Sequence, residues 1–291
     1  MRYRLFILTL AAALLTGCAA DGDSSKTSTA SPTNDDSSSG FTVTVDFLKV
    51  GKADAAVIST GEHIVVIDCG EESDGSKVCK CLDSLDAERV DELILTHYDK
   101  DHIGGAAQVV EDYEVSHVIG ADYTEESAEY TKLDAAMNDK EIKWEFLKDE
   151  TMSFTLDDTD FEIYPCEQEK YSDGNDNNHS LVIKMTHLDD VFLFAADAMQ
   201  ERLDEIMEIG DCDLLKEPYH GREIANLGEF LDKVSPEYAV VSTNKDNYSE
   251  VTEQTLEERG IKTFVTFRDG NIRCTSTGNS LAFETGVSFD D

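Results

Sequence analysis

Residues 97–102, with the sequence HYDKDH, place two histidines and two aspartates close together. They follow the apolar residues 93–95, typical of the end of a buried strand, and precede a helical pattern that begins at Ala106. Imidazole nitrogens and carboxylate oxygens bind divalent transition metals, and glycines at 104 and 105 let the backbone turn sharply beside them. A polar loop with solvated charges is the alternative, but this spacing after a buried strand favours a metal site. The candidate ligands are His97, Asp99, Asp101 and His102.

This segment resembles the His-x-His-x-Asp-His motif of the metallo-β-lactamase superfamily, with Asp99 in place of the second histidine. With the Ile-Gly-Gly that follows, it resembles the hydrolase domain of ComEC-type competence proteins and their free-standing relatives. The resemblance runs from about Phe41 to the C-terminus. It implies an α/β fold, an αββα sandwich with the metals at one edge between the two sheets.

Asp197 closes an apolar run, residues 191–196, that is typical of a fully buried strand. A carboxylate in that place must be neutralised, paired or metal-bound, because burying it alone is costly. The segment resembles the family's Leu-Thr-Gly-Asp motif, in which the aspartate bridges two metals, although alanines replace the threonine and the glycine. The alternative is an N-terminal cap of the helix expected over residues 199–209.

Residues 213–221, DLLKEPYHG, resemble the family's Leu-Lys-Val-Pro-His-His-Gly motif. Tyr219 replaces the first histidine, and His220 matches the last metal-bound imidazole. Lys216 matches a lysine of the motif and is expected to pair with a nearby carboxylate. Asp68, after an apolar strand pattern, matches the superfamily's first acidic motif, whose side chain supports the metal-binding loop through hydrogen bonds.

Residues 176–183, DNNHSLVI, resemble the Asn-x-x-Ser-Leu-Val segment that enters a strand beside the metals, with Asn178 and Ser180 as supporting residues. His179 lies where many superfamily members supply a third histidine to the first metal. That position varies among ComEC-type relatives, so a metal ligand and a hydrogen-bonding loop histidine both remain open.

The resemblance implies two divalent metal ions, zinc or manganese. One ion would be held by His97, Asp99 and Asp197, with His179 as a further candidate. The other would be held by Asp101, His102, Asp197 and His220, of which Asp101 and His220 are also the catalytic candidates. Asp99 adds a hard oxygen donor where imidazole is usual, which shifts the metal preference towards manganese or magnesium.

The N-terminus has the pattern of a targeting segment. Arg2 and Arg4 precede an apolar stretch, residues 5–15, that is too short to span a bilayer. Residues 15–18, LTGC, resemble a bacterial lipoprotein cleavage site, which predicts a signal peptide over residues 1–17 and lipidation of Cys18. An ordinary secretory signal with an incidental cysteine is the alternative. Residues 18–40 are rich in Ser, Thr and Asp and predict a flexible tether, so the protein is expected outside the cytoplasm, anchored to the membrane.

From residue 41 to the C-terminus the pattern predicts one domain of alternating strands and helices. Strands are expected near residues 41–47, 55–58, 64–67, 115–119, 142–146, 152–154, 161–164, 238–242 and 262–267. Helices are expected over residues 106–113, 124–138, 227–234 and 250–259, and Asp269-Gly270 predicts a tight hairpin into residues 272–275. The six cysteines of this domain could form disulfides outside the cytoplasm, but their pairing cannot be read from the sequence.

The formal net charge is −38, from 62 acidic and 24 basic residues. Such an excess repels polyanions at long range. Family resemblance favours a phosphodiester substrate. Because the charge disfavours long nucleic acid, a smaller or wall-linked phosphodiester is as plausible a substrate as DNA. The family's Tyr-Gly-His-Pro element is replaced by residues 247–250, NYSE. This difference, with Asp99 and Tyr219 in place of the family's histidines, is the basis of the alternative function, a non-catalytic envelope binding or scaffold protein that retains the fold.

Overall fold

The computed structural model describes residues 41–172 and 174–290, which belong to the unit Ser39–Asp291. The predicted signal peptide, the lipidation site Cys18 and the tether of residues 18–40 lie outside the described residues. Within the described part, no helix has the length and apolar character needed to cross a membrane.

The strands form two sheets. The first sheet contains β1 (Val43–Phe47), β2 (Ala55–Ser59), β3 (Ile64–Cys69), β4 (Arg89–Leu95), β5 (Glu114–Ala121), β6 (Trp144–Leu147), β14 (Ile272–Ser276) and β15 (Leu281–Thr285), in the order β15-β14-β1-β2-β3-β4-β5-β6. The second contains β7 (Met152–Leu156), β8 (Thr159–Tyr164), β9 (Val182–His187), β10 (Asp190–Phe194), β11 (Leu214–Lys216), β12 (Tyr238–Val241) and β13 (Lys262–Val265), in the order β13-β12-β11-β10-β9-β8-β7.

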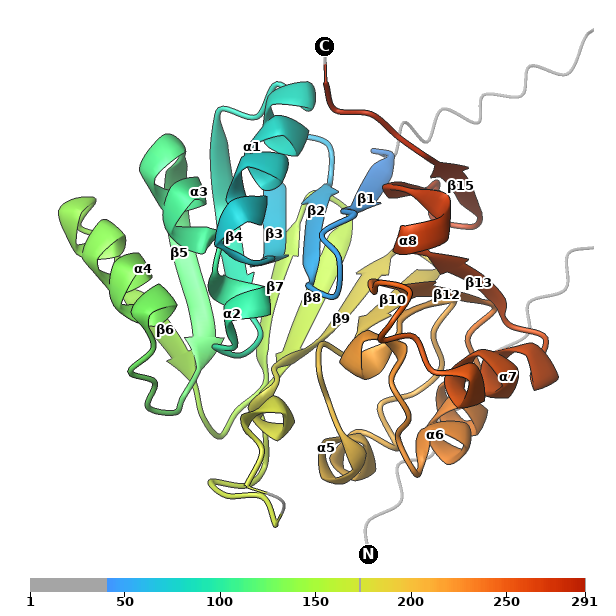
Figure 1. Cartoon of the computed structure of the whole chain (residues 1–291). Coiled ribbons are helices and arrows are strands. Elements are labelled where there is room, and N and C mark those ends of the chain that lie inside the picture. The colour runs from blue at the N-terminus through green and yellow to red at the C-terminus, as the bar shows by residue number, and fades with distance from the viewer. Residues whose placement is uncertain (1–40, 173, 291) are drawn as a thin grey trace, which may run out of the picture. The chain divides into compact units, whose positions relative to one another are not determined.

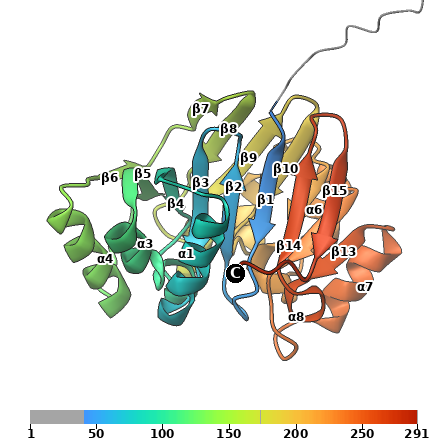
Figure 2. The same cartoon turned by 90° about the horizontal axis from the view of Figure 1, so that it is seen from above.

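Helices cover the outer face of each sheet (Figures 1 and 2). The helices are α1 (Gly75–Ser84), α2 (Lys100–Ile103), α3 (Ala106–Asp112), α4 (Ala128–Asp139), α5 (Gln200–Glu205), α6 (Leu227–Val234), α7 (Glu250–Glu258) and α8 (Thr266–Asp269). Short 3₁₀ turns occur at η1 (Glu72–Asp74), η2 (Asp176–His179) and η3 (Pro218–Gly221). α1, α3 and α4 lie against the first sheet, and α5, α6 and α7 lie against the second.

Three buried apolar clusters hold these layers together. Side chains that alternate along the strands, such as Val45 and Phe47 of β1 and Phe192 and Phe194 of β10, face each other between the sheets. Leu93 of β4 belongs instead to the cluster under α1, α3 and α4, and the third cluster lies under α5, α6 and α7. This layering confirms the predicted αββα sandwich.

Several elements differ from the prediction. The prediction of a hairpin at Asp269-Gly270 is wrong, because residues 266–269 form α8 and the flanking strands β13 and β14 lie in different sheets. β14 pairs instead with β1 and β15, and neither β15 nor α1 was predicted. The helix expected over residues 199–209 is limited to α5. The six cysteines of the described domain are free thiols.

Both sheets contain parallel runs, β3-β4-β5-β6 in the first and β10-β11-β12-β13 in the second. The carboxyl ends of parallel strands meet at one edge, where the connecting loops can bring side chains together. The segments after β4, β10 and β11 carry the predicted ligand motifs, so the topology fixes where the site must form.

Candidate metal centre

Four segments bring metal-binding side chains to this edge. α2 and the turn before it carry the HYDKDH motif, Asp197 follows β10, and His220 lies in η3 directly after β11. The β1–β2 loop adds Asp54. Four groups have ligand atoms within 4.8 Å of one another: His97, His102 and Asp197; Asp101, His102 and His220; Asp54, Asp68 and His102; and Asp54, Asp197 and His220.

Each histidine of the cluster is held through its Nδ1 atom. Nδ1 of His102 lies 2.8 Å from Oδ2 of Asp68. The Asp68 carboxylate also accepts two hydrogen bonds from Thr96, from the backbone N–H to Oδ1 and from the hydroxyl to Oδ2. Nδ1 of His220 lies 3.2 Å from the carbonyl oxygen of Ser242 and 3.5 Å from Oδ1 of Asp54. A histidine held in this way presents its Nε2 atom, as metal-ligating histidines do.

Nδ1 of His97 lies 3.2 Å from the hydroxyl of Thr96 and 3.4 Å from that of Ser180. Ser180 also accepts a hydrogen bond from the backbone of Asp197. The Ser180 hydroxyl therefore links two of the candidate ligands, which come from different sheets.

The Nε2 atoms of all three histidines are buried without a hydrogen-bond partner, and so is Oδ1 of Asp197. These atoms face one another: Nε2 of His102 lies 3.4 Å from Asp197 Oδ1, and Nε2 of His220 lies 3.2 Å from Asp197 Oδ2. Buried polar atoms without partners are costly and rare. Three such imidazole nitrogens beside carboxylate oxygens fit divalent metal ions.

The electrostatics of the cluster also favour a cation. Burial lowers the pKa of His97 to about 3, so its imidazole is neutral and can donate a lone pair. Although burial opposes the charged form of His220, Asp197 and Asp54 raise its pKa to about 9. The carboxylates of Asp197 and Asp68 likewise hold the pKa of His102 well above its usual value against burial. The site therefore stabilises positive charge.

Two lysines contact carboxylates of the site. The buried ammonium of Lys216 pairs with Asp54, which agrees with the prediction that this lysine pairs with a nearby carboxylate. Lys52, which is on the same loop as Asp54, pairs with Asp101. Burial opposes ionisation of Asp101, but His102, Lys52 and His220 together keep its pKa below the usual value.

Asp54 is not among the site residues predicted from the sequence. Its partners in space lie far along the chain, since Lys216 is 162 positions away. The available signal was an acidic residue directly before an apolar strand pattern, within a segment that resembles the opening of the ComEC-type domain.

Asp99 and His179 are not in these four groups. The Asp99 side chain is 49% exposed, with Oδ2 at 3.9 Å from Nε2 of His97. The His179 ring stacks on Tyr123 with centroids 4.8 Å apart and meets Tyr171 edge-on at 5.2 Å. Its Nε2 atom lies 3.3 Å from the carbonyl oxygen of Glu169. Their assignment as ligands stays a prediction.

Asn178 supports the site from the second sheet. Its Oδ1 atom accepts hydrogen bonds from the backbone of Met199 and of Arg202, at the start of α5. These bonds fix the segment that follows Asp197. The predicted supporting residues Asp68, Asn178, Ser180 and Lys216 therefore all contact the candidate ligands or the segments that carry them.

Four residues other than glycine have a left-handed backbone conformation at the site. Asp68, Ala196, Tyr219 and His220 have positive φ angles of 56°, 49°, 50° and 54°. Such conformations cost about 1–3 kcal/mol each for residues other than glycine, and they persist where the surrounding structure fixes them, typically at functional sites. Ala196 occupies the position of the glycine in the family motif, which explains why a glycine suits that motif.

The comparisons with known proteins identify the family of this chain. The family model described as "Metallo-beta-lactamase superfamily" matches residues 48–243, more than half of the chain. ComE operon protein 3 of Bacillus subtilis (strain 168) is 26% identical over 195 residues, covering 64% of this chain and 24% of the relative. The chain thus matches about a quarter of that relative's length.

Among solved structures, the metallo-β-lactamase fold protein YhfI from Bacillus subtilis superposes with a TM-score of 0.54 at 12% identity, covering 77% of this chain and 96% of YhfI. At this identity the match supports the fold. Together with the family match and the ComEC-type relative, it leads to one conclusion: the chain belongs to the metallo-β-lactamase superfamily.

Proposed function

We propose that the protein is a metal-dependent phosphodiesterase that binds two divalent ions at the edge of the sandwich. Membership of the superfamily and the candidate metal centre support metal-dependent hydrolysis as the reaction class. The observation that carries the proposal is the convergence of two buried Nε2 atoms without partners, those of His102 and His220, on the carboxylate of Asp197, with His97 in the same group of ligand atoms.

In this proposal His97, Asp99 and Asp197 hold one ion, and Asp101, His102, Asp197 and His220 hold the other. Bound ions would supply an activated water and positive charge for the reacting phosphoryl oxygens. The Asp101 carboxylate, kept ionised by its neighbours, can accept a hydrogen bond from the attacking water and orient it. Asp68 and Asp54 keep the imidazoles of His102 and His220 in place.

A small or wall-linked phosphodiester is the substrate that suits this chain better than long nucleic acid. The formal net charge of −38 repels a polyanion over its whole length, whereas a single phosphodiester meets the local positive charge of the ions. We further propose that the domain works outside the cytoplasm, held to the membrane by a lipid on Cys18.

The test is to strip the purified domain of metal, reconstitute it with zinc or manganese, and measure hydrolysis of bis(p-nitrophenyl) phosphate. Asp197→Asn should lower metal content and hydrolysis together, because it removes an oxygen ligand shared by both ions. Asp190→Asn is the matched control. Asp190, the first residue of β10, is also buried, but its carboxylate accepts hydrogen bonds from the hydroxyl of Ser276 and the backbone of Gly278. Full metal stoichiometry in Asp197→Asn would refute the assigned site, and metal binding without hydrolysis by the wild type would favour a binding protein.

A further inference from the structure

The β1–β2 loop carries two lysines, Lys49 and Lys52, and only Lys52 contacts a carboxylate of the candidate site. Lys52 contacts Oδ2 of Asp101, the oxygen that also lies 3.7 Å from Nε2 of His220. The Lys52 ammonium is therefore beside the space enclosed by the candidate ligands. Its side chain is 33% exposed, whereas that of Asp101 is 9% exposed, so Lys52 lies between the buried cluster and solvent.

A structural role explains Lys52 poorly. The backbone N–H of Asp54 donates to the carbonyl oxygen of Asp101, and that of Gly70 donates to the carbonyl oxygen of Asp54, so backbone bonds already fasten the loop to the site. The buried pair between Lys216 and Asp54 fastens it further. A partly exposed ion pair adds little, typically 0–1 kcal/mol. Lys52 is thus a cation at the site that the fold does not require.

We infer that Lys52 binds the anionic oxygen of the substrate and makes the site selective for anionic phosphoryl groups over neutral ones. The inference rests on the proposed function and deepens it. A metal ion held by Asp101 would draw on the carboxylate charge that Lys52 now pairs with, and the Lys52 ammonium could then bind a negatively charged oxygen beside it. A lysine is suited to this role because its ammonium is a compact point charge with three donors on a flexible stem.

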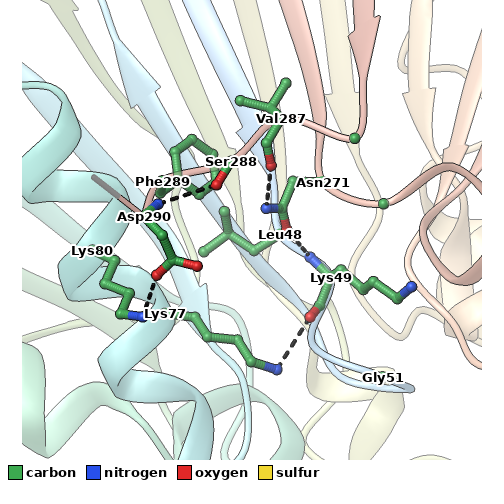
Figure 3. Close-up of a pocket in the computed structure, with 12 residues that line it drawn as sticks. Leu48, Lys49, Gly51, Lys77, Lys80, Asn271, Val287, Ser288, Phe289 and Asp290 are labelled. Carbon is green, nitrogen blue, oxygen red and sulfur yellow. Dashed lines mark hydrogen bonds and ion pairs between the residues drawn. The ribbon is translucent and has the colours of Figure 1, made fainter.

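The same loop supplies a matched control. Lys49 also lies on the β1–β2 loop, but it lines a separate pocket of about 660 Å³ between the loop, α1 and the C-terminal residues (Figure 3). There Asn271 accepts a hydrogen bond from the backbone of Lys49 and donates one to the carbonyl oxygen of Val287. The Lys49 side chain contacts the carbonyl oxygen of Phe267 and no carboxylate of the site, so Lys49→Gln removes one charge from the loop without altering the metal centre.

The probes are the diphenylphosphinate anion and methyldiphenylphosphine oxide. They have similar shape and no ester bond to cleave, but only the first is charged. Binding of each probe to the metal-loaded protein is measured by calorimetry, and metal affinity by competition with a chelator. Lys52→Gln should bind the anion about tenfold more weakly, since a hydrogen bond to a charged group is lost. Lys52→Arg should restore most of the binding, and Lys49→Gln should match the wild type.

The neutral oxide should bind all four proteins equally. Wild-type protein that does not bind the anion, or Lys52→Gln that binds it as tightly as the wild type, overturns the inference. The inference is also overturned if Lys52→Gln loses metal affinity along with anion binding, because Lys52 would then act by supporting the bound ions. Turnover of bis(p-nitrophenyl) phosphate by the wild type is measured separately. Its absence would refute the proposed function, while the binding data would still decide the role of Lys52.

Discussion

Asp54 lies between Lys216 and His220, pairing with the lysine ammonium and placing Oδ1 at 3.5 Å from Nδ1 of the histidine. The lysine neutralises a buried carboxylate, and its charge, with that of His220, keeps the pKa of Asp54 low against the effect of burial. The ionised carboxylate attracts the imidazole of His220, whose Nδ1 atom also lies 3.2 Å from the carbonyl oxygen of Ser242. Three residues from two sheets thereby act as one unit.

This unit makes Asp54 a positioning residue, and the first prediction concerns its removal. Asp54→Asn should weaken zinc binding by about 10–100-fold, the usual cost of losing the carboxylate that orients a metal-bound histidine. Metal affinity is measured by competition with a chelator of known strength. Asp46→Asn is the control, because Asp46 is also buried but lies in β1 and pairs with Arg273. Equal zinc affinity in Asp54→Asn and wild type would show that Asp54 does not support His220.

The second prediction concerns metal preference. A carboxylate at position 99 adds a hard donor beside His97, so zinc should bind tightly while manganese supports equal or greater turnover. Asp99→His should move the activity optimum back towards zinc. Stripped protein is reconstituted with each ion and phosphodiester hydrolysis is compared. An unchanged ranking of the metals would mean that Asp99 does not bind the ion.

His179 provides a third prediction, because its ring is held between Tyr123 and Tyr171 outside the groups of ligand atoms. His179→Phe keeps an aromatic ring for this packing but removes both nitrogens. Metal stoichiometry, measured by elemental analysis of the purified variant, should equal that of the wild type. Loss of one ion per chain would instead establish His179 as a ligand.

Glu217 leads to a prediction about stability and pH. It is fully buried, both carboxylate oxygens are without hydrogen-bond partners, and burial raises its pKa to about 8. The unfolded chain ionises this group near its usual pKa, so the folded state binds more protons between the two values. Folding stability should therefore fall as pH rises from about 5 to about 8.

Glu217→Gln removes this titration while keeping the shape of the side chain. Its melting temperature should exceed that of the wild type by an amount that grows between pH 5 and pH 9. Glu223→Gln, at an exposed position six residues further along, should follow the wild type at every pH. A difference between Glu217→Gln and wild type that is constant with pH would contradict the raised pKa.

The fifth prediction tests the anchor. Cys18→Ser should release the protein from the membrane fraction or leave its precursor uncleaved, because the lipid would be attached to the sulfur atom of Cys18. Fractionation of expressing cells, followed by mass measurement of the product, distinguishes these states. Normal processing with unchanged membrane retention would exclude lipidation at Cys18.

The segments that carry the candidate ligands could be recognised in the sequence because each is short and contiguous and follows an apolar strand. HYDKDH shows its chemistry within six residues, and Asp197 and His220 each follow a buried strand directly. The sandwich was predictable for a related reason, since strand and helix patterns are local and the motifs indicated the family.

Pairing between distant segments was not predictable in this way. The Asp269-Gly270 signal was read as a hairpin, but the sheet that each flanking strand joins depends on contacts made far along the chain. The same holds for Asp54, whose role depends on a lysine in the other sheet, and for His179, whose ring position is set by two tyrosines. Local turn and ligand chemistry fixes what a residue can do, whereas tertiary packing decides which partner it meets.

The position of β1 between β2 and β14 has a consequence for how the chain folds. Arg273 of β14 pairs with Asp46 of β1 across 227 positions of sequence, so the first sheet cannot be completed until nearly the whole chain is available. Closing so long a loop costs entropy before any contact offsets it, and domains rich in such distant pairings fold slowly. The loop that carries Asp54 and Lys52 begins directly after β1, so the metal centre should become competent among the last events of folding.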